Sequence, residues 1–185
     1  MSFEVIKQSI PDILLIKPKV FADERGYFKE SYNLQDFETF LPGVNFVQDN
    51  ESKSDRGVIR GLHFQRAPHA QAKLIRVIQG SIWDVAVDIR AESPTFKQYC
   101  FAELTADNHM QFFVPRGFAH AFLVTSETAI VQYKTDNFYE AAADGGIHPH
   151  DPDLNIPWPF RKNQHILSSK DQVQPTLSVF IERSN

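Results

Sequence analysis

Short stretches of alternating apolar and polar residues run through most of the chain. The clearest spans residues 81–90, where Trp83, Val85, Val87 and Ile89 alternate with Asp84, Ala86, Asp88 and Arg90. A period of two is typical of a β-strand with one apolar face, and its other face can carry chemistry. We expect further strands in similar runs at residues 14–20, 44–47, 73–78, 99–104, 111–114, 119–124 and 129–134.

Helical patterns are few. Residues 34–40, which Asn33 or Ser31 could cap, and residues 168–174 are the two stretches that we expect to be helical. Many short strands separated by turn residues predict an all-β jelly roll, or double-stranded β-helix, with a few short helices. We expect residues 1–185 to form one domain, with the proline-rich tail after Pro149 wrapping over the barrel.

Composition and charge narrow the classes of function. The chain has 42% hydrophobic residues and a net charge of −4, with no run of like charges. It therefore offers no basic patch for nucleic acid or for a membrane surface. No 18-residue apolar stretch predicts a membrane span. The single cysteine, Cys100, has no internal disulfide partner and is expected to be an inert core thiol, so we expect a cytoplasmic protein.

Two blocks of sequence resemble the motifs of the cupin superfamily. They are Arg60-Gly61-Leu62-His63-Phe64-Gln65 with the following stretch from Lys73 to Gly80, and Pro115-Arg116-Gly117-Phe118-Ala119-His120. Metal-binding cupins have His-x-His and a Glu seven residues before a Gly in the first block. Here Gln65 replaces the second His and Lys73 stands at the Glu position. An ammonium group repels a cation, and two imidazoles are too few ligands, so we expect no metal.

An electropositive pocket without a metal suits a developing enolate. Proton abstraction beside a carbonyl needs a base that titrates near neutrality, a cation at the carbonyl oxygen and an acid that returns the proton. His63 is the candidate base, and Asp171 is a candidate to orient its ring. Lys73 can balance the oxyanion. Tyr133 could donate from the opposite face of the reacting carbon, because inversion requires an acid distinct from the base.

Each of these residues also has a purely structural reading. Tyr133 could be ordinary barrel packing with its hydroxyl at the rim. Lys73 and Arg60 could be solvated charges on strand edges. Asp84 and Asp88 share one face of their strand, which leaves three alternatives: an outer polar face, a hydrogen-bonded pair inside the barrel, or support for a histidine.

A longer set of motifs resembles the dTDP-4-dehydrorhamnose 3,5-epimerase family, in order and from about residue 6 to residue 177. The motifs are Phe21-Ala22-Asp23-Glu24-Arg25-Gly26-Tyr27-Phe28, Phe46-Val47-Gln48-Asp49-Asn50, Gly57-Val58-Ile59-Arg60-Gly61-Leu62-His63-Phe64-Gln65, Asp84-Val85-Ala86-Val87-Asp88-Ile89-Arg90 and the block that ends at His120. The resemblance implies a homodimeric jelly roll. It also implies an isomerase that needs no cofactor and that converts dTDP-4-dehydro-6-deoxy-glucose to dTDP-4-dehydro-rhamnose.

The resemblance also implies roles for individual residues. His63 matches the proton acceptor, Tyr133 the proton donor, and Lys73 the residue at the enolate oxygen. Substrate contacts are implied for Arg60, His120, Gln48, Asp49, Asn50, Asp144 and Lys170, and we expect Tyr139 to stack on the nucleotide base. Lys170 and Asp171 match a C-terminal lid pair. Arg25 and Glu30 match contacts from an N-terminal strand that is exchanged with the dimer partner, so that each site is shared.

Two positions depart from the pattern of that family. Asp144 stands where the family usually has Glu, and Pro149 stands where a Trp is often found. Neither is the proposed acid or base, so the departures concern the grip on the nucleotide. Two alternative functions stay open: an epimerase of one centre, C3 or C5, on a related dTDP-4-keto-deoxysugar, and a non-catalytic cupin that binds sugar nucleotides.

Overall fold

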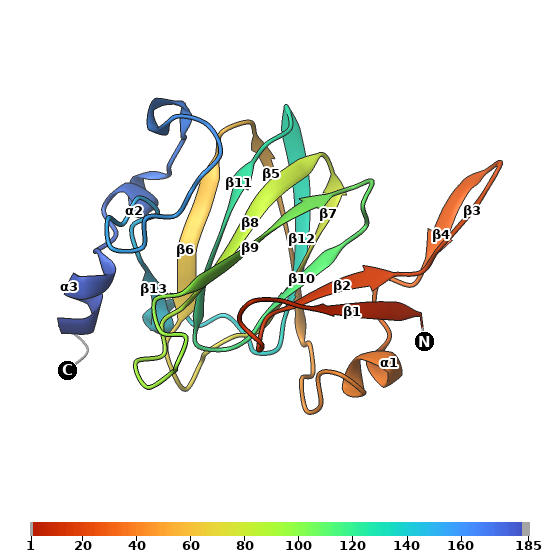
Figure 1. Cartoon of the computed structure of the whole chain (residues 1–185), viewed down its shortest axis with the longest axis horizontal. Coiled ribbons are helices and arrows are strands. Elements are labelled where there is room, and N and C mark those ends of the chain that lie inside the picture. Colours follow the sequence, from red (N-terminus) through yellow and green to blue (C-terminus); the bar gives the residue numbers. More distant parts are fainter. Residues whose placement is uncertain (1, 183–185) are drawn as a thin grey trace.

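Two antiparallel β-sheets face each other in the computed structural model, which describes residues 2–182 (Figure 1). One sheet has the order β1-β2-β10-β7-β12-β5, and the other has the order β13-β6-β11-β8-β9. The first contains β1 (Phe3–Lys7), β2 (Leu14–Pro18), β10 (Gln111–Val114), β7 (Lys73–Gln79), β12 (Thr128–Thr135) and β5 (Gln48–Asp55). The second contains β13 (Asp144–Gly146), β6 (Ile59–Gln65), β11 (Phe118–Val124), β8 (Ser81–Asp88) and β9 (Tyr99–Thr105).

The main core lies between the sheets. Both sheets contribute buried residues to it, among them Ile75 and Val131 from the six-stranded sheet and Ala86 and Phe122 from the five-stranded sheet. This arrangement confirms the predicted all-β jelly roll. Polar residues of both sheets, among them Ser52, Arg60 and His120, line a cavity beside this core.

The outer faces of both sheets are covered by the ends of the chain. The apolar face predicted for residues 81–90 packs outward, because Val85 and Val87 lie in a cluster with Leu154 and Ile156 of the C-terminal segment. That segment contains η2 (Lys162–Gln164), α2 (Ser169–Gln172) and α3 (Leu177–Glu182), and η1 (Ala141–Ala143) precedes β13. Helix α1 (Leu34–Glu38) covers the other sheet and buries Phe37.

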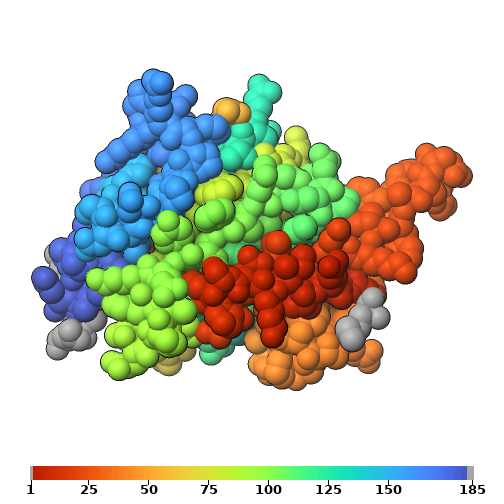
Figure 2. Space-filling model, viewed as in Figure 1, coloured from red at the N-terminus to blue at the C-terminus, as the bar shows by residue number. Residues whose placement is uncertain are grey.

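A two-stranded arm projects from the body of the molecule at the end opposite the C-terminal segment (Figures 1 and 2). It consists of β3 (Val20–Asp23) and β4 (Gly26–Lys29), which pair only with each other in the sheet topology of residues 2–182. Its apolar side chains are open to solvent, and Phe28 is 68% exposed. Exposed aromatic residues on a projecting hairpin are typical of a surface that a partner covers.

Several predicted elements differ in their boundaries. The run 14–20 is divided between β2 and β3, because the chain leaves the sheet after Pro18 and enters the arm. The helices are shorter than predicted, and the side chain of Asn33, rather than Ser31, accepts a hydrogen bond from the Gln35 amide to cap α1. No helix among residues 2–182 combines the length and the apolar character needed to cross a bilayer.

The strand predicted at residues 44–47 is wrong. Those residues have no regular structure, and β5 begins at Gln48. The alternation of Val44 and Phe46 reflects their packing beside the cluster under α1. Strand β5 itself is almost entirely polar, because one of its faces lines a polar cavity, so its sequence has no apolar alternation.

Candidate active site

The candidate base, cation and acid come from facing strands. His63 lies on β6 of the five-stranded sheet, whereas Lys73 on β7 and Tyr133 on β12 belong to the six-stranded sheet. The Lys73 ammonium lies 3.4 Å from the main-chain oxygen of His63 and 6.0 Å from the centre of the Tyr133 ring. The lysine therefore bridges the two sheets and stands between the other two side chains.

These three residues line two adjoining hollows. One is about 180 Å³ and the other about 290 Å³, and because His63, Lys73 and Tyr133 line both, the hollows meet at them. The first is completed by Phe64, Gln65, Gln71, Tyr139, Asp144 and Lys170. The second is completed by Asn50, Glu51, Ser52, Arg60, His120 and Phe122. The cleft thus extends on both sides of the candidate acid and base.

The His63 ring is oriented by Asp171. Its Nε2 lies 2.6 Å from Asp171 Oδ1, and that carboxylate is almost wholly buried on α2. Burial alone would raise the pKa of Asp171, but hydrogen bonds from His63, Ser168 and the Gly61 backbone lower it below its ordinary value. An ionised carboxylate accepts the proton of Nε2–H, which leaves Nδ1 of the neutral imidazole as the proton acceptor.

Lys73 is desolvated. Burial lowers its pKa to about 8, although the negative charges of Asp84 and Asp144 oppose this shift. An ammonium near its titration point in a site of low dielectric interacts strongly with an oxyanion and retains its charge at neutral pH. The reading of Lys73 as a solvated strand-edge charge is therefore wrong.

The phenol of Tyr133 is held in its protonated form. Burial raises its pKa, and the charge of Arg60 opposes this effect. A protonated phenol can donate to a carbanionic carbon, as a general acid must. Arg60 is held by Ser54, whose hydroxyl accepts from its Nε at 2.9 Å.

A second His–Asp pair lies beside the first. His120 is directly opposite His63 in the pairing of β11 with β6, and its Nε2 is 2.6 Å from Asp84 Oδ1. Both side chains are buried, and burial raises the pKa of Asp84 and lowers that of His120, while their mutual attraction opposes both shifts. Of the three alternatives for Asp84, the structure agrees with the third: its carboxylate is hydrogen-bonded to the ring of His120. Asp88 instead binds Arg90, Ser93 and Thr95 in a loop.

The structure gathers most of the predicted binding residues. Arg60, His120, Asn50, Tyr139, Asp144 and Lys170 line the cleft. Gln48 and Asp49 lie at the start of β5, where Gln48 Oε1 accepts from the Tyr139 amide at 3.3 Å and Asp49 pairs with Lys134. Arg25 and Glu30 are not among the lining residues. Arg25 lies on the arm, where it pairs with Asp23, and Glu30 follows β4.

Sequence reasoning did not identify every residue of the cleft. Gln65 and Gln71 line it, and each also holds the loop after β12, through hydrogen bonds to the main chain of Glu140 and Asn137 respectively. Gln65 stands in the first cupin block, where a metal-binding cupin has histidine. That position in the motif could have identified Gln65 as a residue of the cleft. Ser52 has a buried hydroxyl with no hydrogen-bond partner among the described residues, and no motif marked it.

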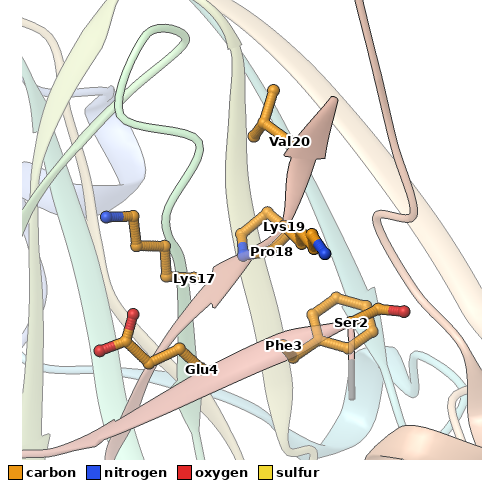
Figure 3. A pocket seen from close by; sticks show the side chains of 7 residues that line it. All are labelled: Ser2, Phe3, Glu4, Lys17, Pro18, Lys19 and Val20. Atoms are coloured by element: carbon orange, nitrogen blue, oxygen red, sulfur yellow. The ribbon is translucent and has the colours of Figure 1, made fainter. Parts of the chain in front are cut away.

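A larger hollow, of about 450 Å³, lies elsewhere, at the edge formed by β1 and β2 (Figure 3). Glu4 and Lys17 point to the same side there, opposite each other in the strand pairing, while Lys19 points away. Its lining residues include no histidine and no tyrosine. Within residues 2–182, no three His, Cys, Asp or Glu side chains gather in a way that could hold a metal ion.

Comparisons with known proteins identify the family of the chain. A family model described as dTDP-4-dehydrorhamnose 3,5-epimerase matches residues 7–178. The dTDP-4-dehydrorhamnose 3,5-epimerase of Salmonella typhimurium is 51% identical over 174 residues, which cover 94% of each chain. The match extends over nearly the whole length of both proteins.

Two solved structures extend the comparison. A dTDP-6-deoxy-D-glucose-3,5-epimerase from Legionella pneumophila, in complex with dTDP-4-keto-L-rhamnose, has a TM-score of 0.92 and 42% identity, and the match covers 96% of this chain and 94% of that one. ChmJ, a 3'-monoepimerase from Streptomyces bikiniensis in complex with dTDP-quinovose, has a TM-score of 0.91 and 30% identity, covering 96% and 90%. The resemblance inferred from the motifs is confirmed, and this chain belongs to the dTDP-4-dehydrorhamnose 3,5-epimerase family of isomerases.

Proposed function

We propose that this protein inverts C3 and C5 of dTDP-4-dehydro-6-deoxy-D-glucose to give dTDP-4-dehydro-L-rhamnose, in the biosynthesis of dTDP-rhamnose and without a cofactor. The observation that supports this proposal is the convergence of His63, Lys73 and Tyr133 on one cleft. An imidazole, an ammonium and a phenol around one cavity are the groups that enolisation requires.

The reaction follows from the state of each group. Nδ1 of His63 removes the proton from the carbon beside the 4-keto group, and the electrons of that C–H bond move into an enolate whose oxygen lies at the Lys73 ammonium. The Tyr133 hydroxyl then gives a proton to the same carbon from the opposite face. The imidazolium and phenolate that result exchange protons with solvent, and the cycle repeats at the second carbon. No electrons are gained or lost overall.

The remaining residues of the cleft hold the substrate. Arg60 and His120 provide cationic and donor groups for the sugar and diphosphate. Residues 48–50 and the exposed ring of Tyr139 would contact the nucleotide; Gln48 and Tyr139 are neighbours, because Gln48 accepts a hydrogen bond from the Tyr139 amide. The cytoplasm, where dTDP-sugars are made, is the proposed site of action, and a single buried cysteine fits a reducing compartment.

The active unit is proposed to be a homodimer with shared sites. The arm carries Arg25 and exposes Phe21, Tyr27 and Phe28, so a second copy of the chain would cover these rings and receive Arg25 and Glu30 at its cleft. Burial of exposed aromatic rings is a large favourable contribution to association.

An epimerase of one centre is the second candidate, favoured by the full-length match to a 3'-monoepimerase. Proton NMR of the reaction of dTDP-4-keto-6-deoxyglucose in deuterium oxide separates the candidates. The proposed function predicts deuterium at both C3 and C5 of the product. Deuterium at one carbon identifies the one-centre enzyme. Binding of the nucleotide sugar with no exchange at either carbon contradicts both and identifies a non-catalytic cupin.

A further inference from the structure

Helix α2 makes two ion pairs from consecutive residues. Asp171 pairs with His63 on β6 at 2.6 Å, and Lys170 pairs with Asp144 at the start of β13. Strand β13 lies beside β6, with Asp144 opposite Gln65 and Gly146 opposite His63. Because α2 is a single turn, a displacement of Lys170 must also displace Asp171. The two ion pairs are therefore mechanically coupled.

The segment that carries α2 is fixed at both ends. The main chain of Ile166 exchanges hydrogen bonds with Gly57 and Ile59, at 2.9 and 3.0 Å. Beyond α2, the Pro175 oxygen accepts from the His148 amide at 2.8 Å. Between these two points Lys170 lines the cleft, and Val173 is 80% exposed to solvent.

Contacts within the segment shape the turn without fixing it to the sheet. The Ser168 hydroxyl accepts from the Asp171 backbone amide at 3.1 Å and so caps α2, and Nε2 of the Gln172 side chain donates to the Leu167 main-chain oxygen. These bonds join residues of the segment to each other. The position of the turn over β6 therefore depends on two side chains: Asp171, which binds His63 and the Gly61 backbone, and Lys170, which binds Asp144.

We propose that Asp144 and Lys170 are positioning residues for the base: their ion pair holds α2 so that Asp171 stays against Nε2 of His63. This proposal deepens the proposed function, because it assigns to the pair an action on the base in addition to any contact with substrate. The Tyr139 hydroxyl lies 3.4 Å from the same Asp144 oxygen, so a ligand that moves Tyr139 would also act on this pair.

The direct readout is the tautomer of His63 in the free protein. Ring ¹⁵N chemical shifts distinguish Nε2–H from Nδ1–H, and in the wild type they should report one tautomer, with the proton on Nε2. Asp144→Asn, which keeps the shape and removes the charge, should give a mixture of tautomers, and Lys170→Met should do the same. Asp144→Glu keeps the charge and should keep a single tautomer.

Kinetics provide the second readout. Loss of an ion pair of this exposure should lower kcat about two- to tenfold in both charge-removing variants, through misorientation of the base. Asp12→Asn is the matched control, because it breaks a partly exposed ion pair with Arg90 that is remote from α2. It should change neither the tautomer nor kcat.

A single tautomer retained in Asp144→Asn or in Lys170→Met would overturn the proposal, as would a rise in KM with kcat unchanged. In either case the pair would be a substrate contact only. The tautomer is measured without substrate, so its result does not depend on whether the proposed reaction is correct.

Discussion

The chemistry of single residues in this protein is set by what surrounds them. Lys73 lies between His63 and Tyr133 in the interior, where burial brings its pKa to about 8, while Asp84 and Asp144 keep it from falling further. An exposed lysine would be charged over the whole physiological range but would interact weakly with an enolate across water. Desolvation makes the ammonium effective at the oxyanion, and it also makes its charge depend on pH.

The pH profile of kcat/KM should show this dependence. The Lys73 ammonium is present below pH 8 and is lost above it, so kcat/KM should fall on the alkaline side with a midpoint near 8. Lys73→Arg, which stays charged, should be less active because of its different shape but should lose this alkaline limb. The exposed control Lys97→Arg should keep it. An unchanged limb in Lys73→Arg would assign the titration to another group.

At this scale the sequence predicted the candidate base, cation and acid, because two cupin blocks and a family resemblance place them. It left three readings for Asp84, since alternation shows that residues share a face but not which face is interior. The structure has the face of Asp84 inside the barrel and the apolar face of Val85 under the C-terminal segment. Which face of this strand is interior depends on where the C-terminal segment packs, and that segment is distant in sequence.

Among the elements, β5 shows why periodicity has limits. Its residues alternate between a polar cavity and solvent, so hydropathy does not indicate a strand there. The irregular stretch 44–47 has the alternating pattern of a strand only because Val44 and Phe46 pack beside the cluster under α1. The projecting arm was likewise predicted only through the family resemblance. A hydropathy pattern detects strands and helices that pack against the core of their own chain. It does not detect elements such as β5 or the arm, which face a cavity, a ligand or another chain.

The C-terminal segment contains a hydrogen-bonded relay of three histidines. His165 Nε2 donates to the Pro159 oxygen, so its Nδ1 accepts from His150 Nε2–H at 2.8 Å, and His148 Nδ1 accepts from the His150 amide. Burial lowers the pKa of His150 to about 4, and the nearby His165, Lys162 and His148 act in the same direction. The fold therefore favours the neutral form of this ring.

Stability of the fold should consequently fall in acid. The unfolded chain binds a proton at His150 near pH 6.5, so the contribution of this residue is complete above that pH and is lost as the pH falls toward 4. Allowing for the partial exposure of the ring, we expect a loss of about 1–2 kcal/mol. Thermal unfolding between pH 7 and pH 4 should show a smaller decline in Tm for His150→Gln than for the wild type or the control His69→Gln. Equal declines would contradict the relay.

At the scale of the whole molecule, the proposed homodimer means that one chain does not complete its own site. The arm and the C-terminal segment lie at opposite ends of the long axis, and the cleft lined by His63 does not include Arg25 (Figure 1). A projecting element that bears both apolar rings and a cation fits exchange between two copies related by twofold symmetry.

Hybrid dimers test the sharing of sites. Arg25→Ala and His63→Ala should each be nearly inactive as homodimers, because each removes one side of every site. After subunit exchange, hybrid dimers have one site with both residues intact, so an equal mixture should recover roughly a quarter of wild-type activity. Mixtures of His63→Ala with Tyr133→Phe, which damage the same side, should recover none. Absence of recovery in the first mixture would place Arg25 outside the partner's site.

The central claim is that His63 and Tyr133 act on opposite faces of one sugar ring, as base and acid. Its most direct test is the NMR-monitored exchange of substrate protons in deuterium oxide, measured for both variants. His63→Ala should abolish exchange and turnover together, whereas Tyr133→Phe should still exchange protons beside the ketone while forming little inverted product. Turnover by His63→Ala at a rate near that of the wild type, or loss of exchange in Tyr133→Phe, would contradict the account.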